Sequence, residues 1–194
     1  DVVDQVLASI LGFRTHDSSG LLTVGRIADP AGSTPTITFT EENIIDGSLR
    51  RQQTGAPFHQ VTVAHTRNWT VQDDDAVAAT AVEPDFAKEE YRRSIAEDSI
   101  AVQAEHLLAR TLEDETLFIS SSDATTEATR RLGLLKPQRD VYQFSARGVP
   151  FQYSVGQVIR LQIPRFGLDA GRNFVILAVG ESSTTYSTFL EVWG

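Results

Sequence analysis

Apolar residues recur at helical spacing in two parts of the first 110 residues. Near the start of the chain, the stretch 2–13 (VVDQVLASILGF) carries a repeat of three and four residues that ends at Gly12, which predicts a short amphipathic helix. The repeating residues are Val3, Leu7, Ile10 and Leu11. The stretch 98–110 (DSIAVQAEHLLAR) predicts another helix, with Asp98 or Ser99 as its cap. The residues that this spacing aligns on one face are Ile100, Ala104 and Leu107.

The clearest helical pattern of the chain covers residues 123–136. A Ser or Asp residue at its start can cap the helix, and Pro137 ends it. The apolar stripe consists of Ala124, Ala128, Leu132 and Leu135. Because these residues repeat at three and four positions, we expect the stripe to pack against a sheet.

Other stretches predict strands. GLLTVGRI (20–27) and TPTITFT (34–40) are rich in β-branched residues and are separated by turn-forming residues, so a hairpin is the simplest connection between them. HQVTVAHTRNWTV (59–71) alternates over eight or more residues, which puts Arg67 and Trp69 on the face of Val61 and Val63.

Further strands are expected later in the chain. ETLFIS (115–120) predicts one strand, and the last third predicts three more over YSVGQVIRLQIP (153–164), NFVILAV (173–179) and STTYSTFLEVW (183–193). Short connections between successive strands of this kind are typical of a small antiparallel barrel or sandwich.

These patterns predict an α+β fold in which β-rich halves form small antiparallel barrel or sandwich units around a helical segment. At residue 73 the composition shifts to Ala and carboxylates, and Pro84 prevents one continuous helix there. We therefore expect a β-rich domain with a short N-terminal helix over 1–72, an acidic helical and α/β segment over 73–138, and an antiparallel barrel-like domain over 139–194.

Composition narrows the classes of function. The chain has 194 residues with 41% hydrophobic and 22% charged residues, as in ordinary soluble globular proteins. It has no cysteine, which excludes disulfides, cysteine-ligated metals and thiol catalysis, and it contains no stretch approaching the length of a membrane span. Because the chain begins at Asp1 and has no methionine, we expect it to be an excerpt of a longer protein.

The charge of the chain argues against nucleic acid as a partner. The net charge is -9 and the pI is about 4.9, whereas phosphate binding needs a basic face. All cations except Lys88 and Lys136 are arginines, a residue that protein interfaces favour. A GC-rich genome would give the same bias.

The loop RFGLDAGRNF (165–174) is the stretch most like a ligand loop. It matches neither the dinucleotide fingerprint nor a P-loop, and a strand pattern rather than a helix follows it. We expect Gly167 and Gly171 to be turn residues with positive φ between two strands, and we expect no nucleotide or other cofactor to bind.

No catalytic or metal site is predicted. The four histidines, at positions 16, 59, 65 and 106, lie in separate segments without metal-ligand spacing, and His65 reads as a satisfied core or surface histidine. The carboxylates do not follow a calcium-loop pattern, and no nucleophile motif is present. A catalytic pair of carboxylates that lie far apart in the sequence but close in space is not excluded by the sequence.

Several stretches together resemble the tail-tip, or baseplate hub, proteins of long-tailed bacteriophages and prophages. The resemblance runs from about residue 7 to residue 194. The stretches that carry it are GLLTVGRI, DGSLRRQ, VAHTRNWTVQDD, KEEYRRSIAED, TEATRRL, VGQVIRLQIPRFGLDAGRNFVILAVGE and LEVWG. It implies a structural, non-enzymatic virion protein that joins the tail tube to the distal fibre, helps to form the channel for genome delivery in host entry, and is assembled in the host cytoplasm. It also implies a homotrimer with other tail proteins as partners.

Four arginines are our candidate interface residues in such an assembly: Arg67, Arg92, Arg93 and Arg165. We expect them to pair with carboxylates of neighbouring subunits or tail proteins. The alternative function is a receptor-binding or carbohydrate-binding module of a tail fibre. Such a module needs exposed aromatic platforms, whereas Trp69 and Trp193 lie in strand patterns that favour core packing. A hydrolase with dispersed carboxylates is the third candidate.

Overall fold

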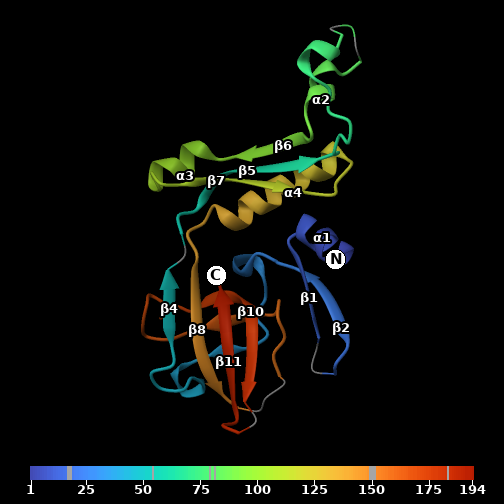
Figure 1. Cartoon of the computed structure of the whole chain (residues 1–194). Helices are drawn as coiled ribbons and strands as arrows, with labels where there is room; N and C mark the ends of the chain where they lie inside the picture. Colours follow the sequence, from blue (N-terminus) through green and yellow to red (C-terminus); the bar gives the residue numbers. More distant parts are fainter. Residues whose placement is uncertain (17–18, 54, 79, 81, 149–151, 183) are drawn as a thin grey trace. The chain divides into compact units, whose positions relative to one another are not determined.

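The structure is a computed structural model of residues 1–194, and it describes all of them except 17–18, 54, 79, 81, 149–151 and 183 (Figure 1). The chain divides into two compact units, each built from two separate stretches of sequence. The first unit consists of Asp1–Ile10 and Ala56–Pro137, and the second of Leu11–Gly55 and Gln138–Gly194. Residues 1–72 therefore contribute to both units.

The first unit is a three-stranded sheet with a long helix against one face (Figure 1). In the sheet, β5 lies in the centre, antiparallel to β6 and parallel to β7. The elements are α1 (Val2–Ser9), β5 (Phe58–His65), a 3-10 turn (Asp74–Ala76), α2 (Pro84–Lys88), β6 (Arg92–Glu97), α3 (Ser99–Glu105), β7 (Arg110–Glu115) and α4 (Ser121–Leu135).

The helix α4 confirms the pattern that predicted it. Ser120 caps it by accepting a hydrogen bond from the Asp123 amide. The side chains that form the core between α4 and the sheet are Val61, Val63, Ala124, Ala128 and Leu132, with Leu135 packed at the edge. Burial of the small alanines lets the helix approach the sheet closely, and the leucine repeat fills the end of that contact.

The second unit is a curled, half-barrel sheet of six strands in the order β3-β9-β10-β11-β8-β4. All of its strand pairs are antiparallel except β3 with β9. Its core lies on the side lined by alternate residues of β8, β9, β10 and β11, including Tyr142, Phe144, Leu161 and Phe174. The elements are β1 (Gly12–His16), β2 (Leu22–Arg26), β3 (Thr38–Phe39), β4 (Arg50–Gln53), β8 (Asp140–Arg147), β9 (Val158–Leu161), β10 (Arg172–Ser182), β11 (Ser187–Trp193) and 3-10 turns at Pro30–Gly32 and Glu41–Asn43.

The predicted pairing of the two early strands is wrong. Strand β2 pairs with β1, in a two-stranded sheet of their own, and β3 pairs instead with β9, more than 100 residues away in sequence. The β1 segment lies partly in the stretch that reads as the end of a helix. The helix α1 stops at Ser9, and Leu11 takes a φ of 47° immediately before β1 begins.

Two other expectations for the first unit need correction. The strand expected at 115–120 is β7 at Arg110–Glu115, five residues earlier. The helix α3 forms behind its Asp98 cap, but its expected apolar face is not buried: Ile100 and Leu107 are 90% and 91% exposed, and Val102 is the buried residue.

The strands expected in the last third of the chain are confirmed as β9, β10 and β11, and the α+β fold class is confirmed with them. Among the described residues, no helix is both long enough and apolar enough to cross a bilayer.

Candidate interaction site

The site lies in the first unit, where β5 ends. The strand stops after His65 because Thr66 has a positive φ of 52°, which turns the chain out of the sheet. The Thr66 amide donates to the Phe118 carbonyl oxygen at 2.7 Å, and its hydroxyl donates to the Ile119 carbonyl oxygen at 3.1 Å. These bonds fix the turn against the segment that follows β7.

Beyond this turn, Arg67 lies against two aromatic rings. Its guanidinium carbon is 4.2 Å from the Trp69 ring centroid and 5.6 Å from the Tyr91 ring centroid, and its Nη2 forms an ion pair with Glu90 at 2.6 Å. Trp69 is 78% exposed. The prediction of core packing for Trp69 is therefore wrong, because the alternating pattern continues in the sequence past the point where the strand ends.

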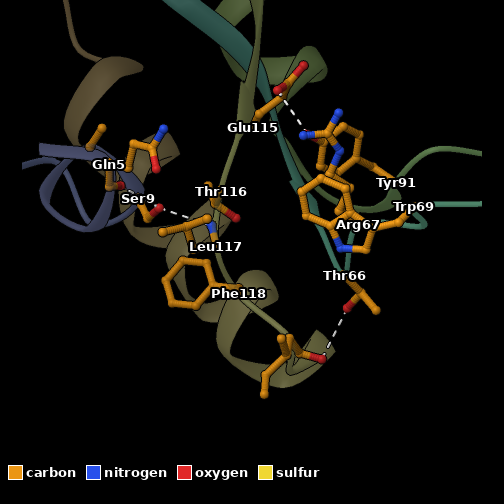
Figure 2. A pocket seen from close by; sticks show the side chains of 12 residues that line it. Gln5, Ser9, Thr66, Arg67, Trp69, Tyr91, Glu115, Thr116, Leu117 and Phe118 are labelled. Atoms are coloured by element: carbon orange, nitrogen blue, oxygen red, sulfur yellow. Dashed lines mark hydrogen bonds between the residues drawn. The ribbon is translucent and has the colours of Figure 1, made fainter. Parts of the chain in front are cut away.

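Tyr91 is the buried member of this group. It is buried, and its hydroxyl donates to Oε2 of Glu115 at 3.0 Å (Figure 2). Burial, together with this hydrogen bond to a carboxylate, raises the pKa of Tyr91. The phenol therefore stays protonated and holds the Glu115 carboxylate in one orientation.

These residues line one side of a pocket of about 490 Å³ (Figure 2). The opposite side comes from α1, through Gln5, Ala8 and Ser9, and the floor comes from the residues after β7. Two aliphatic side chains of that segment stay largely in solvent: Leu117 is 56% exposed and Ile119 is 86% exposed. The pocket thus combines exposed apolar surface with an arginine, a tryptophan and a tyrosine, the residue types that dominate protein interface energies.

The helix α1 is held in place by a buried ionic network. The Ser9 hydroxyl oxygen accepts a bond from the Leu117 amide at 3.0 Å (Figure 2). Arg131 of α4, which is 1% exposed, donates to the carbonyl oxygens of Ala8 at 3.1 Å and Ser9 at 2.7 Å. These are carbonyls of the last turn of α1, where the hydrogen bonds of the helix run out, although the Ala8 carbonyl also accepts from the Ile10 amide.

The same arginine side chain is neutralised by two carboxylates. Arg131 Nε donates to Glu127 Oε1 at 2.9 Å, and its Nη1 pairs with Asp114 of β7. Arg130 adds a further pair to Glu127 at 2.7 Å. Burial alone would raise the pKa of Glu127, but the hydrogen bonds and charges of Arg130 and Arg131 outweigh it and lower the pKa.

Three of the four candidate interface arginines lie at this end of the sheet. Besides Arg67, Arg92 pairs with Glu83 and stacks on the Phe86 ring at 4.3 Å. Arg93 pairs with Glu113 at 2.9 Å and with Glu89 at 3.2 Å. Each of the three thus has a carboxylate partner within the chain. Their role between subunits stays a prediction.

The fourth candidate, Arg165, lies in the second unit, in the loop between β9 and β10. Gly167 and Gly171 have φ of 73° and 75°, so the prediction that both are positive-φ turn residues is confirmed. The buried side chain of Leu168 anchors this loop. Arg165 is exposed and borders a pocket of about 300 Å³ that also contains Glu41 and Asp46, and within the described part of the chain no carboxylate lies in ion-pair distance of it.

His65 lies in the core, which is one of the two places expected for it. It is 2% exposed, its Nδ1 is 2.8 Å from the Thr66 hydroxyl, and its Nε2 is 3.2 Å from the Ser94 hydroxyl. Burial and the nearby Arg92 charge lower its pKa, so the ring stays neutral. Ser94 is also buried, and the two side chains satisfy each other's hydrogen-bonding groups within the first unit. No group of three or more metal-binding side chains occurs among the described residues.

The sequence interpretation missed Tyr91, Glu115 and the network of Glu127 and Arg131. The sequence does place Glu127 three residues before Arg130 and four before Arg131, a spacing that allows ion pairs along a helix. The same spacing is equally typical of a helix face exposed to solvent, so it did not indicate a buried network. Nothing local marks the partners of Tyr91, since Glu115 lies 24 residues away.

Comparison with known proteins gives matches at the level of structure. No family model and no curated protein matches the chain. A chain of the virion of a native gene transfer agent particle shares the fold with a TM-score of 0.63 and 12% identity, over 98% of this chain and 37% of that one. A tail protein from Neisseria meningitidis MC58 matches with a TM-score of 0.56 and 13% identity, over 96% of this chain and 52% of that one.

A third match is the prophage tail protein gp18 from Listeria monocytogenes EGD-e, with a TM-score of 0.51 and 9% identity, over all of this chain and 51% of that one. The chain therefore spans about half of these proteins or less. It has the fold of phage tail and virion proteins, which confirms the expected resemblance to phage tail proteins at the level of fold.

Proposed function

We propose that this chain is a structural part of a phage tail tip, or baseplate hub, that joins the tail tube to the distal fibre and helps to form the channel for genome delivery. The observation that carries the proposal is the fold, which covers 96–100% of the chain in matches to a virion chain and two tail proteins. The proposal includes a homotrimer with other tail proteins as partners, a place in the virion after assembly in the host cytoplasm, and no catalytic role.

The charge of the chain supports this role. A net charge of -9 repels the phosphates of a passing genome and so keeps a channel wall from binding it. We therefore expect the chain not to retain duplex DNA at physiological salt. Retention in a filter-binding assay would contradict this part of the proposal.

The location is tested on particles. The full-length protein that contains this chain would carry an epitope tag, and gold-labelled antibody would locate it by electron microscopy of purified particles. Labels at the tail tip support the proposal. Labels along the tube, on the head, or none on intact tagged particles would overturn it.

The candidate arginines are tested best at Arg165, because reversing Arg67, Arg92 or Arg93 would also break ion pairs within the chain. We expect Arg165→Glu to reduce particle assembly while the circular dichroism spectrum stays unchanged. Arg50→Glu, an equal charge change on the exposed side of β4, is the control. Normal infectious particles with Arg165→Glu would remove Arg165 from the proposed interface.

One observation favours the alternative of a carbohydrate-binding or receptor-binding module. The exposed Trp69 ring offers the aromatic platform that such a module needs. In a Trp193→Phe background Trp69 is the single tryptophan, so its fluorescence reports on the pocket alone. A saturable change with a sugar panel would favour this second function, and no change would leave the structural role as the better one.

A further inference from the structure

The pocket beside Trp69 contains a carboxylate without a cation. Glu115 lines the pocket and is exposed, and its Oε2 accepts from the Tyr91 hydroxyl at 3.0 Å. Within the described part of the chain, no arginine or lysine lies in ion-pair distance of Glu115. The other charged group of the pocket, Arg67, is already neutralised by Glu90 at 2.6 Å. The pocket therefore keeps one negative charge that nothing in the chain compensates.

Apolar surface lines the same pocket as this carboxylate. The side chains of Trp69, Leu117 and Ile119 are all exposed there (Figure 2). A ligand that suits both features has an aliphatic stem of several carbons and a positive charge at its end. Lysine and arginine side chains have this form, because their methylene groups pack on apolar surface while the charged head stays with polar groups.

The hydrogen bond from Tyr91 selects between these two side chains. An arginine fork binds best when it reaches both oxygens of a carboxylate, but one oxygen of Glu115 already accepts from the buried phenol. The ammonium of lysine is a compact charge that needs a single acceptor. We propose that the pocket binds the side chain of a lysine presented by another protein, with the ammonium donating to Oε1 of Glu115 and the stem lying against Trp69.

The lysine comes from a protein other than this chain. The sequence contains two lysines, and all its other cations are arginines. Lys88 pairs with Asp74 at 3.2 Å, and Lys136 pairs with Asp98 at 3.0 Å. A second copy of the chain therefore has no lysine that is without a carboxylate partner. That the lysine-bearing partner is another tail protein rests on the proposed function, whereas the selection of lysine by the pocket does not.

The distribution of charge also favours a basic partner. The first unit contains 17 carboxylates against 8 arginines and lysines, which gives it a formal net charge of -9. The second unit contains 9 of each and is neutral. The whole net charge of the chain thus belongs to the unit that carries the pocket. Such a field speeds the encounter with a basic surface, and salt screens it.

Peptide titration of the whole chain tests the chemistry of the pocket. The readout is the fluorescence of Trp69 in the Trp193→Phe background. The probe is a glycine peptide with blocked ends and one central lysine, and the comparison peptides carry norleucine or arginine in its place. Norleucine keeps the stem without the ammonium, so we expect the lysine peptide to bind about tenfold more tightly than the norleucine peptide. It should also bind more tightly than the arginine peptide. Equal binding of either comparison peptide, or no saturable change with the lysine peptide, would overturn the proposal.

Two changes of equal charge separate the pocket from the overall field. Glu115→Gln should weaken binding of the lysine peptide about tenfold. Glu105→Gln is the matched control, because it removes the same charge from an exposed residue of α3 that does not line the pocket, and it should leave binding unchanged. Equal losses in the two variants would show that the peptide follows the net charge of the unit. That result, or full binding by Glu115→Gln, would overturn the proposal.

Tyr91→Phe tests the positioning role of the phenol. The change keeps the ring and the charge of Glu115 but releases its second oxygen. We therefore expect the arginine peptide to gain affinity relative to the lysine peptide. An unchanged ratio of the two affinities, whatever their absolute values, would overturn the selection of lysine through Tyr91.

Purified particles test the source of the lysine. A carbodiimide joins a carboxylate directly to a lysine amine, so mass spectrometry of treated particles should find Glu115 linked to a lysine of another protein. A link to Lys88 or Lys136 of a second copy would overturn the proposal, as would links at other carboxylates of this chain with none at Glu115. Either result in particles labelled at the tail tip leaves the proposed function intact. Selective binding of the lysine peptide by a chain that labels elsewhere would overturn the proposed function and leave the lysine site.

Discussion

Replacing Arg131 tests how α1 is attached to the first unit. We consider Arg131→Met, which keeps most of the side-chain volume and removes the guanidinium. The change removes the Arg131 donor from the Asp114 carboxylate and from the Ala8 and Ser9 carbonyls, while Glu127 keeps its pair with Arg130.

The expected cost follows from burial. Arg131 and Glu127 are both 1% exposed, and breaking a buried pair by removing one partner costs about 3–5 kcal/mol. Lys136→Met is the matched control. The pair of Lys136 with Asp98, 3.0 Å apart, has side chains 45% and 30% exposed, so its loss should cost less than about 1 kcal/mol.

The assay is hydrogen exchange of the whole chain by mass spectrometry, because it resolves the two units and the individual helices. In Arg131→Met we expect the amides of α1 to lose protection first, followed by those of α4 and β7, while the half-barrel sheet is unchanged. A loss below about 1 kcal/mol, equal to the control, would refute the reasoning that this network carries the attachment of α1.

Three further predictions concern the same two units. Because the pKa of Glu127 is lowered, the stability that its carboxylate contributes is present above the unfolded pKa and is lost as the pH falls through the folded pKa. The difference in unfolding free energy between Glu127→Gln and the unchanged chain should therefore vanish in acid, and a constant difference from pH 7 to the acid limit would contradict this. Leu132→Ala should cost about 2–5 kcal/mol in denaturant unfolding, and a cost of roughly 0.5 kcal/mol would show a surface position. Gly171→Ala should destabilise the chain because a side chain there meets both a φ of 75° and the Arg160 guanidinium group, so an unchanged melting temperature would argue against this loop geometry.

The sequence predicts several of the elements whose pattern is set by local burial, but it missed β8, in which burial also alternates along the strand. In β9 and β11 every second residue faces the core, and in α4 the apolar stripe faces the sheet, so the periodicity reads directly. Strand pairing is different, since it depends on residues far apart. Nothing within 20–40 indicates that β3 joins β9 or that β2 turns back on β1.

The site was less predictable than the fold. The strand that predicted a buried Trp69 continues only to His65, where the positive φ of Thr66 ends it, and β5 is buried on both faces over Val61–His65 rather than on alternate residues. Likewise, the spacing of Ile100 and Leu107 is helical, but α3 has only seven residues and covers no core with that face. In both cases the spacing of apolar residues predicted a buried face, but the structure leaves those residues exposed.

These exposed residues change where an interface is best sought. The arginine bias suggested contacts through charge, yet Arg67, Arg92, Arg93 and Arg131 all pair with carboxylates of the same unit, so these four arginines already have a use within the chain. Ion pairs between exposed groups add little affinity, whereas burial of a large apolar surface adds much. If copies of this chain assemble through the first unit, the exposed apolar side chains of the pocket should supply most of the affinity, and the arginines should set orientation and rate of association. Raising the salt concentration should therefore slow association of the first unit's surfaces more than it accelerates their dissociation, and a contact whose dissociation rate follows salt instead would show that charge dominates it.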